Sequence, residues 1–446
     1  MNIEGYREGD TIAGEATPPG RGGISVIRLS GEKTHDIVSR LIEQDIPKAG
    51  EFKVGYFHHH GRPTEIIDQV IISCYKAPYS YTGEDVIELS LHGNPVLVSA
   101  MLAELYSAGA RASQPGEFTF RAFINGRIDL TQAEAVSELI TSTSIESADF
   151  AFQRLIGSIK DNADIISNQI LKLLSVYEIE LDFVEEDVSV ASKEENKFAI
   201  EDILIGFNGL LTGYKQSHSM QSGVQVALVG HPNVGKSSLF NRLINQQKAI
   251  THHQPGTTRD ALDSAFMING IEFTLYDTAG IRESGEEVEN VGVERALKIS
   301  ARCELIIEVS SVDIGSEYRY IGKSEQKVIK VINKIDFAND YNLGGKLGVS
   351  AQDGTGMGAL CDAMYKFAIG SEAVSRKTVS NERQYHLMKK AQQFATNAKE
   401  CIDNDSPQEI VAEELRATLS CVDEMTGKGR LDTILENIFS KFCIGK

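Results

Sequence analysis

The chain has 446 residues, of which 41% are hydrophobic, and its formal net charge is −19. Because this length exceeds what one hydrophobic core usually supports, we expect two or three domains. The acidic balance excludes a protein whose whole surface binds nucleic acid, because contacts with phosphates require clustered lysine and arginine.

The sequence also predicts the compartment. It holds no run of 18 apolar residues, and its first residues lack the basic and apolar regions of a signal peptide. The six cysteines are dispersed without CxxC spacing, which is typical of free thiols in a reducing compartment. We therefore predict a cytoplasmic protein with no membrane span.

The N-terminal region, residues 1–125, alternates strand-like runs at 25–29, 70–75 and 86–91 with glycine and proline turns. Short alternating runs bounded by such turns are typical of strands. This pattern predicts an α+β domain.

Two later stretches, residues 126–220 and 372–446, have apolar residues at helical spacing and few prolines. The simplest architecture packs both stretches into one all-α domain, with an α/β domain of residues 221–371 inserted between them. The predicted fold class is therefore multidomain, with an α+β N-terminal part, an all-α helical part and an inserted α/β part.

The inserted segment opens with an apolar strand at 224–229 that leads into a GxxxxGK[ST] loop at 230–237. Backbone N–H groups of such a loop cradle phosphate oxygens. We expect Lys236 to reach the β and γ phosphates and assist catalysis, and the Ser237 hydroxyl to hold Mg²⁺. The predicted nucleotide contacts of this loop are Asn233, Val234, Gly235, Lys236, Ser237 and Ser238.

Three further motifs follow in the order that a guanine-nucleotide switch requires. Asp277-Thr278-Ala279-Gly280 follows a strand-like run, and its carboxylate suits Mg²⁺ while its last N–H suits a γ phosphate. Asn333-Lys334-Ile335-Asp336 follows another run, and the Asp336 carboxylate matches two N–H donors of guanine, which favours GTP over ATP. Ser350-Ala351 fits the last base-contacting loop. An ordered series is far more specific than one loop, so this segment is predicted to be a GTPase.

One position differs from small GTPases, which commonly place a water-orienting glutamine after the DxxG motif. Ile281 stands there, and its side chain neither donates nor accepts a hydrogen bond. Catalysis therefore requires another residue, another ion or another chain.

With these motifs, the chain resembles the MnmE (TrmE) family of tRNA modification GTPases nearly from end to end. The closing Cys443-Ile444-Gly445-Lys446 matches the family's terminal CxGK motif. The other stretches that carry the resemblance are residues 10–23, 81–88, 92–93, 115–118 and 129–135.

In that family K⁺ takes the place of an arginine finger, which explains the missing glutamine. The resemblance implies that Asn233 binds K⁺, that Thr258 binds Mg²⁺ and that Glu289 orients the attacking water. It adds to the nucleotide site His252, His253, Gln254, Pro255, Gly256, Thr257 and Thr258, of which His252, Gln254 and Thr257 join Asn233 around K⁺.

The resemblance also implies a homodimer formed through the N-terminal domains, which bind 5-formyl-tetrahydrofolate or a related folate. This site carries over to Arg28, Glu88, Arg127 and Lys446, with Arg127 standing where the family usually has lysine. The Glu88 carboxylate suits paired N–H donors of a pterin edge. For Cys443 two interpretations stay open, a thiol in the folate-associated chemistry and a small apolar residue near a helix end.

Finally, the resemblance implies a heterotetramer with MnmG (GidA), which uses FAD and NADH and supplies much of the tRNA surface. Together they would install an aminomethyl or carboxymethylaminomethyl group at C5 of the wobble uridine of certain tRNAs. Two alternatives stay open, a ribosome-assembly GTPase of the Era or EngA kind and a folate-dependent one-carbon transferase whose GTPase part is only regulatory. The net charge of −19 and the N-terminal motifs count against the first alternative.

Overall fold

The structure is a computed structural model of the chain, and it divides into two compact units. Unit 1 comprises Met1–Ser137, Leu155–Leu174 and Leu415–Lys446, and unit 2 comprises Glu138–Arg154 and Ser175–Glu414. The described residues are 9–182, 191–246, 263–277, 299–314, 326–337, 343–370 and 378–429, with the single residues 435, 438, 439, 442 and 445. Both units contain helical segments, so the domain boundaries given above stay a prediction.

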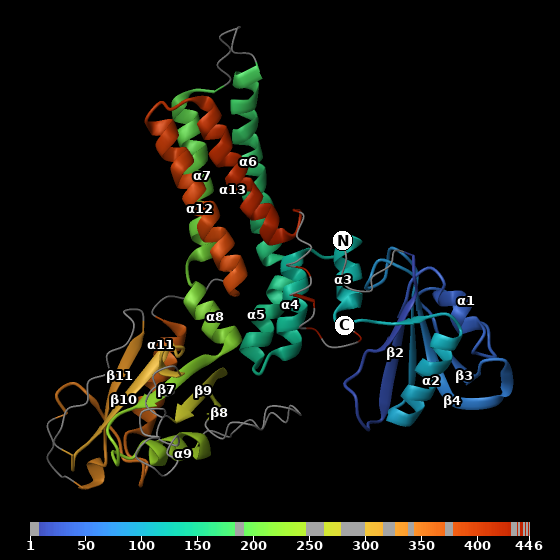
Figure 1. Ribbon diagram of the computed structural model, residues 1–446, viewed down its shortest axis with the longest axis horizontal. Coiled ribbons are helices and arrows are strands. Elements are labelled where there is room, and N and C mark those ends of the chain that lie inside the picture. Colours follow the sequence, from blue (N-terminus) through green and yellow to red (C-terminus); the bar gives the residue numbers. More distant parts are fainter. Residues whose placement is uncertain are drawn as a thin grey trace, which may run out of the picture. The chain divides into compact units, whose positions relative to one another are not determined.

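Unit 1 is built on a six-stranded sheet with the order β3-β4-β5-β2-β1-β6. Neighbouring strands are antiparallel except β1 and β6. α1 (Thr34–Ser39) and α2 (Pro95–Ser107) bury the alternate aliphatic side chains of one face, such as Ile27 and Leu89 (Figure 1). The strands are β1 (Ile12–Glu15), β2 (Ile24–Ser30), β3 (Phe52–His59), β4 (Arg62–Tyr75), β5 (Val86–His92) and β6 (Arg111–Ala112).

The end of the chain packs into unit 1. Phe439 contacts Phe120 of α3 (Glu117–Ile124) edge to face, with ring centroids 5.4 Å apart. Gly445 has φ +89° and lies so close to the Glu15 carbonyl that a Cβ atom would overlap it. Gly445, the glycine of the terminal CxGK motif, therefore lies against the end of β1 in the N-terminal sheet.

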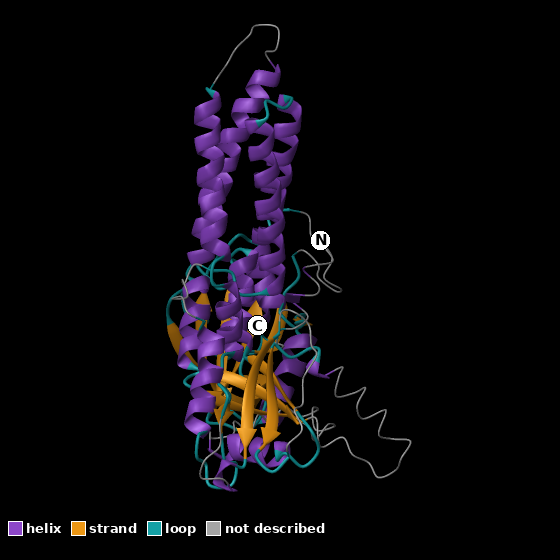
Figure 2. Ribbon diagram, turned by 90° about the vertical axis from the view of Figure 1, so that its left-hand side faces the viewer, coloured by secondary structure: helices purple, strands orange, loops and turns teal. Residues whose placement is uncertain are grey.

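Long helices make up the helical region, and Figure 2 shows them as continuous rods distinct from the strands. A capping box of Ser192 and Glu195 starts α7, which packs along α12. No described helix combines the length and the apolar character that crossing a membrane requires. The helices are α4 (Leu130–Thr141), α5 (Ile145–Leu155), α6 (Ser158–Asp182), α7 (Lys193–Leu211), α8 (Tyr214–Ser222), α12 (Glu382–Asp403) and α13 (Gln408–Thr426).

The last helical stretch contains a break, since Leu435, Ile438 and Phe439 beyond α13 are again helical. α13 ends at Thr426, because Gly427 follows at φ +84° in the left-handed region. A Cβ atom on Gly427 would lie 2.7 Å from the Phe123 ring, so the break also makes room for that ring.

Unit 2 contains a second six-stranded sheet, in the order β12-β11-β10-β7-β9-β8. Its strands are parallel except β8, which is antiparallel to β9. α9 (Lys236–Gln246) and α11 (Met357–Ile369) contribute Leu239 and Leu360 to the buried core of this sheet. The strands are β7 (Val224–Val229), β8 (Asp263–Ile268), β9 (Ile271–Asp277), β10 (Leu305–Ser311), β11 (Lys327–Asn333) and β12 (Leu347–Gly348).

The chain enters and leaves this α/β part at one place. The Val379 N–H donates to the Leu210 carbonyl over 3.0 Å, and the Thr378 hydroxyl donates to the Thr212 carbonyl over 2.8 Å. The α/β part is thus an insertion in the helical region, as the sequence predicts, and the predicted fold class is confirmed.

Candidate functional site

The phosphate loop lies between β7 and α9, and two of its glycines are required by close approaches. Gly230 (φ +152°) and Gly235 (φ +90°) have conformations that side chains with a Cβ atom rarely adopt. A Cβ atom on Gly230 would overlap the Val309 carbonyl of β10, and one on Gly235 would overlap the Asn333 amide. The loop therefore lies directly against β10 and the end of β11.

The Lys236 ammonium lies inside this loop, where it donates to the carbonyls of Gly230 and His231 over 2.9 Å each. Ser237 and Ser238 of the first turn of α9 are exposed. Asp277 ends β9 and pairs in register with Leu228 near the end of β7. Cation and hydroxyl groups for phosphates, and a carboxylate suited to Mg²⁺, therefore gather at the carboxyl ends of two adjacent strands.

The base-reading segments are joined to the phosphate loop by the Asn333 side chain. Its Nδ2 donates to the Val234 carbonyl over 2.9 Å, and its Oδ1 accepts the Ala351 N–H over 3.1 Å. Asp336 is exposed in the short turn Ile335–Phe337, while Ser350 is fully buried. The structure thus brings together three predicted nucleotide-binding segments that are far apart in the sequence.

Several predicted site residues lie outside the described residues, and their roles stay predictions. They are His252, His253, Gln254, Pro255, Gly256, Thr257, Thr258, Thr278, Ala279, Gly280, Glu289, Cys443 and Lys446.

The predicted folate residues Arg28 and Glu88 form an ion pair. They are register partners on β2 and β5, and Arg28 Nε lies 2.8 Å from Glu88 Oε1. The Arg28 guanidinium also lies 5.3 Å from the centre of the Tyr81 ring and 5.6 Å from that of Phe118. Aromatic faces attract guanidinium groups, so the two rings help to orient the Arg28 side chain. Both charged side chains stay about one-fifth exposed, at 19% and 23%.

Arg127 is brought to the same loop but makes a different kind of contact. A Cβ atom on Gly83 would lie 3.1 Å from Arg127 Cγ, so the stem of the side chain covers the 81–88 loop. Arg127 itself is exposed. Arg127 therefore lies beside the 81–88 motif, as a residue of the predicted folate site would, and its contact there is with Gly83.

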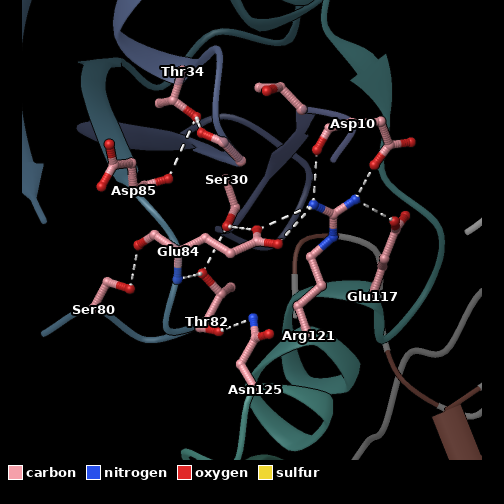
Figure 3. A network of polar contacts seen from close by, with 12 residues as sticks. Asp10, Ser30, Thr34, Ser80, Thr82, Glu84, Asp85, Glu117, Arg121 and Asn125 are labelled. Carbon is pink, nitrogen blue, oxygen red and sulfur yellow. Dashed lines mark hydrogen bonds and ion pairs between the residues drawn. The ribbon is translucent and has the colours of Figure 1, made fainter. Parts of the chain in front are cut away.

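Sequence analysis missed a buried network around Arg121 of α3 (Figure 3), whose side chain is 1% exposed. Arg121 contacts Asp10, Glu84 at 3.0 Å and Glu117 at 3.1 Å. Ser30 also donates to Glu84, over 2.7 Å. Glu84 of the 81–88 motif therefore holds the loop in place. The available signal was that motifs far apart in the sequence all carry acidic residues, among them Asp10, Glu84 and Glu117.

Comparison with known proteins finds two family models that match adjacent parts of the chain. A family model described as the MnmE helical domain matches residues 130–443, and one described as the GTP-binding protein TrmE N-terminus matches residues 11–127. A solved structure of Era from Aquifex aeolicus, bound to GDP.AlF4-, is 21% identical with a TM-score of 0.26. It covers 38% of this chain and 66% of that chain.

Full-length relatives are named tRNA modification GTPase MnmE. The one from Acinetobacter baumannii (strain AYE) is 36% identical over 449 residues, which cover 98% of each chain. The one from Koribacter versatilis (strain Ellin345) is 36% identical over 459 residues and covers 100% of each chain. The resemblance seen in the sequence and the predicted GTPase activity are confirmed. This chain belongs to the MnmE family of tRNA modification GTPases.

Proposed function

We propose that this GTPase acts with a FAD- and NADH-dependent partner of the MnmG kind on the wobble uridine of certain tRNAs. The two proteins install an aminomethyl or carboxymethylaminomethyl group at C5, with the one-carbon unit taken from a tetrahydrofolate. The observation that carries the proposal is that one chain holds both an assembled phosphate loop and the Arg28–Glu88 pair. A switch that only binds and hydrolyses GTP has no use for the second site.

The residues of the phosphate loop fit two metal ions. The exposed Ser237 hydroxyl and the Asp277 carboxylate are oxygen donors of the kind that Mg²⁺ prefers, and Thr258 would join them. Asn233 is exposed beside them and would hold K⁺ with His252, Gln254 and Thr257. The K⁺ ion supplies positive charge for the transition state, where Ile281 supplies no hydrogen bond.

Other residues of the chain have the remaining roles in binding and hydrolysing GTP. Lys236 holds the β and γ phosphates, Glu289 orients the attacking water, and Asp336 with Asn333 selects guanine. Asn333 connects these tasks, because its two amide atoms bond the phosphate loop and the Ser350-Ala351 loop.

The Arg28–Glu88 pair fits one edge of a folate. A carboxylate has about four lone-pair sites, and Arg28 uses its Nε–H on Glu88, so both groups keep capacity for a ligand. Adjacent N–H donors beside a carbonyl, as on a pterin, match a carboxylate beside a guanidinium. Arg127 and Lys446 would complete the site, since Gly445 is held against β1.

The same sheet face supports a homodimer. Phe52, Ser73, Glu88 and Arg28 are successive cross-strand partners on β3, β4, β5 and β2, so their side chains share one face. Large apolar side chains on this face are open to solvent: Phe52 of the row is 77% exposed, and Val54, two residues along the same strand, is 52% exposed. Exposed apolar side chains on one face of a sheet are typical of an interface, and we propose that a second copy of the chain covers them.

Nucleoside analysis tests the proposal. In a strain that lacks this protein, the modified wobble uridine disappears from the affected tRNAs and returns with the wild-type chain. Intact wobble uridine with defective ribosomal subunits instead supports the ribosome-assembly alternative. A modification that persists undiminished when GTP binding is weakened by Asp336→Asn supports the transferase with a regulatory GTPase part.

A further inference from the structure

One acidic residue of the GTPase part, Asp313, has no role in the motifs of the sequence. It lies just beyond β10, and its Oδ2 is 2.7 Å from the Lys334 ammonium. The same ammonium donates to the Asn233 main-chain carbonyl over 2.9 Å. Lys334 therefore links the carboxylate of Asp313 to the phosphate loop.

The linked residue Asn233 has an unusual backbone conformation. Its φ is +64°, in the left-handed region that few residues with a side chain occupy. Such a conformation persists only where surrounding contacts hold it, and the hydrogen bond from Lys334 falls on the carbonyl of this residue. The direction of the Asn233 side chain depends on this backbone conformation.

We infer that Asp313 is a positioning residue for GTP hydrolysis, which acts through Lys334 to hold Asn233 in the conformation that presents its side chain to a monovalent cation. This inference rests on the proposed function, in which Asn233 binds K⁺. Asp313 itself contacts neither the phosphates nor the ion in this role.

The charge of Asp313 is what Lys334 requires. The hydrogen bond from Lys334 lowers the pKa of the Asp313 carboxyl, so the group is ionised at neutral pH. Lys334 is 26% exposed, and a lysine side chain without a fixed partner gains conformational entropy in water. Without the Asp313 charge, the ammonium spends less time on the Asn233 carbonyl.

The test is steady-state GTP hydrolysis by the full-length chain as K⁺ is varied at constant ionic strength. Asp313 is half-exposed and its pair is of moderate strength, so Asp313→Asn should raise the K⁺ concentration for half-maximal rate about two- to five-fold. Asp313→Glu keeps the charge, so its K⁺ concentration for half-maximal rate should lie between those of the wild type and Asp313→Asn. Asp362→Asn on α11 removes an exposed carboxylate of the same domain and should match the wild type.

Two outcomes separate this inference from the proposed function. If K⁺ stimulates the wild type but the curve of Asp313→Asn is unchanged, the inference is wrong and the K⁺ assignment stands. If the wild type is indifferent to K⁺, the K⁺ assignment fails and the inference fails with it.

A double variant distinguishes positioning from simple loss of stability. In the Asn233→Ala background the side chain that would bind K⁺ is absent. Adding Asp313→Asn should therefore change neither the rate nor its K⁺ dependence further. A structural defect would instead add to the effect of Asn233→Ala. Additive losses of rate would therefore overturn the inference.

Discussion

Arg28 donates a hydrogen bond to Glu88 over 2.8 Å, although 60 positions separate them in the chain. The pair lies on the face of the N-terminal sheet opposite α1 and α2, with the Tyr81 and Phe118 rings near the guanidinium. A charged pair that is partly open, and whose cation lies near two rings, fits the folate site that we propose.

Glu88→Ala should weaken the binding of 5-formyl-tetrahydrofolate by about ten- to a hundred-fold. The variant removes charge-assisted hydrogen bonds worth roughly 1.5 to 3 kcal/mol. Calorimetric titration into the full-length protein measures this. Glu65→Ala, which breaks an exposed pair with Arg62 on the long strand β4, serves as control. Wild-type affinity in Glu88→Ala would place the folate elsewhere.

GTP hydrolysis should be faster in K⁺ than in Na⁺ at equal ionic strength, and Asn233→Ala should abolish this difference. The variant should slow hydrolysis by about 10²-fold, the effect of losing one group that stabilises transition-state charge. GTP affinity should change far less, because the ion matters chiefly as charge is redistributed. Measuring both quantities decides the point, and equal losses of affinity and rate would refute it.

Asp336→Asn should weaken GTP binding by about ten- to a hundred-fold and improve the relative binding of xanthine nucleotides. The exposed carboxylate becomes an amide that presents a donor as well as an acceptor to the base. Competition between GTP and XTP for binding to the full-length chain measures this discrimination. Unchanged discrimination would remove Asp336 from the base site.

Arg121→Met should loosen the N-terminal sheet. It removes the cation that Asp10, Glu84 and Glu117 share and leaves only Arg111 paired with Asp10 and Glu117, and breaking a buried ion pair costs about 3 to 5 kcal/mol. Amide hydrogen exchange in β1 and β2 should accelerate by about a hundred-fold or more, with little change in β7 and β10. Arg62→Met, which removes an exposed cation from the same domain, should leave exchange almost unaltered.

Two buried thiols should resist alkylation at pH 8. Burial raises the pKa of Cys74 to about 11 and that of Cys303 to about 12, so thiolate is scarce and its fraction grows about tenfold per pH unit. The partly exposed Cys401 should react with iodoacetamide first. Peptide mass spectrometry of the native protein follows each site. Labelling of Cys303 as fast as Cys401 at pH 8 would contradict this burial.

The nucleotide site was predictable because its chemistry is local in sequence. The loop from Gly230 to Ser237 carries its strand, turn and helix together, and the order of the later motifs fixes their place along one sheet edge. The part played by Asp313 was not predictable in this way. Its partner Lys334 is reached only when β10 and β11 lie side by side.

The N-terminal motifs show the opposite difficulty. The 81–88 motif was recognised in the sequence, but two of its acidic residues have different roles. Glu84 pairs with the buried Arg121, while Glu88 pairs with Arg28 on the open face of the sheet. Nothing in their spacing separates the two, because register and burial are set by strands from distant segments. The helical stretch of residues 372–446 was predicted as a pattern, but its break at Gly427 lies against the Phe123 ring, which comes from a distant segment.

The bonds from Thr378 and Val379 to the end of α7 also bear on how the chain folds. Pairing α7 with α12 requires the chain to close a loop that contains the entire GTPase part, and an unstructured loop of that length carries a large entropic cost. Once the GTPase part has folded with its two ends adjacent, it acts as a short connection and that cost falls. Folding of the GTPase part before α7 pairs with α12 is therefore the order of events with the lower entropic cost.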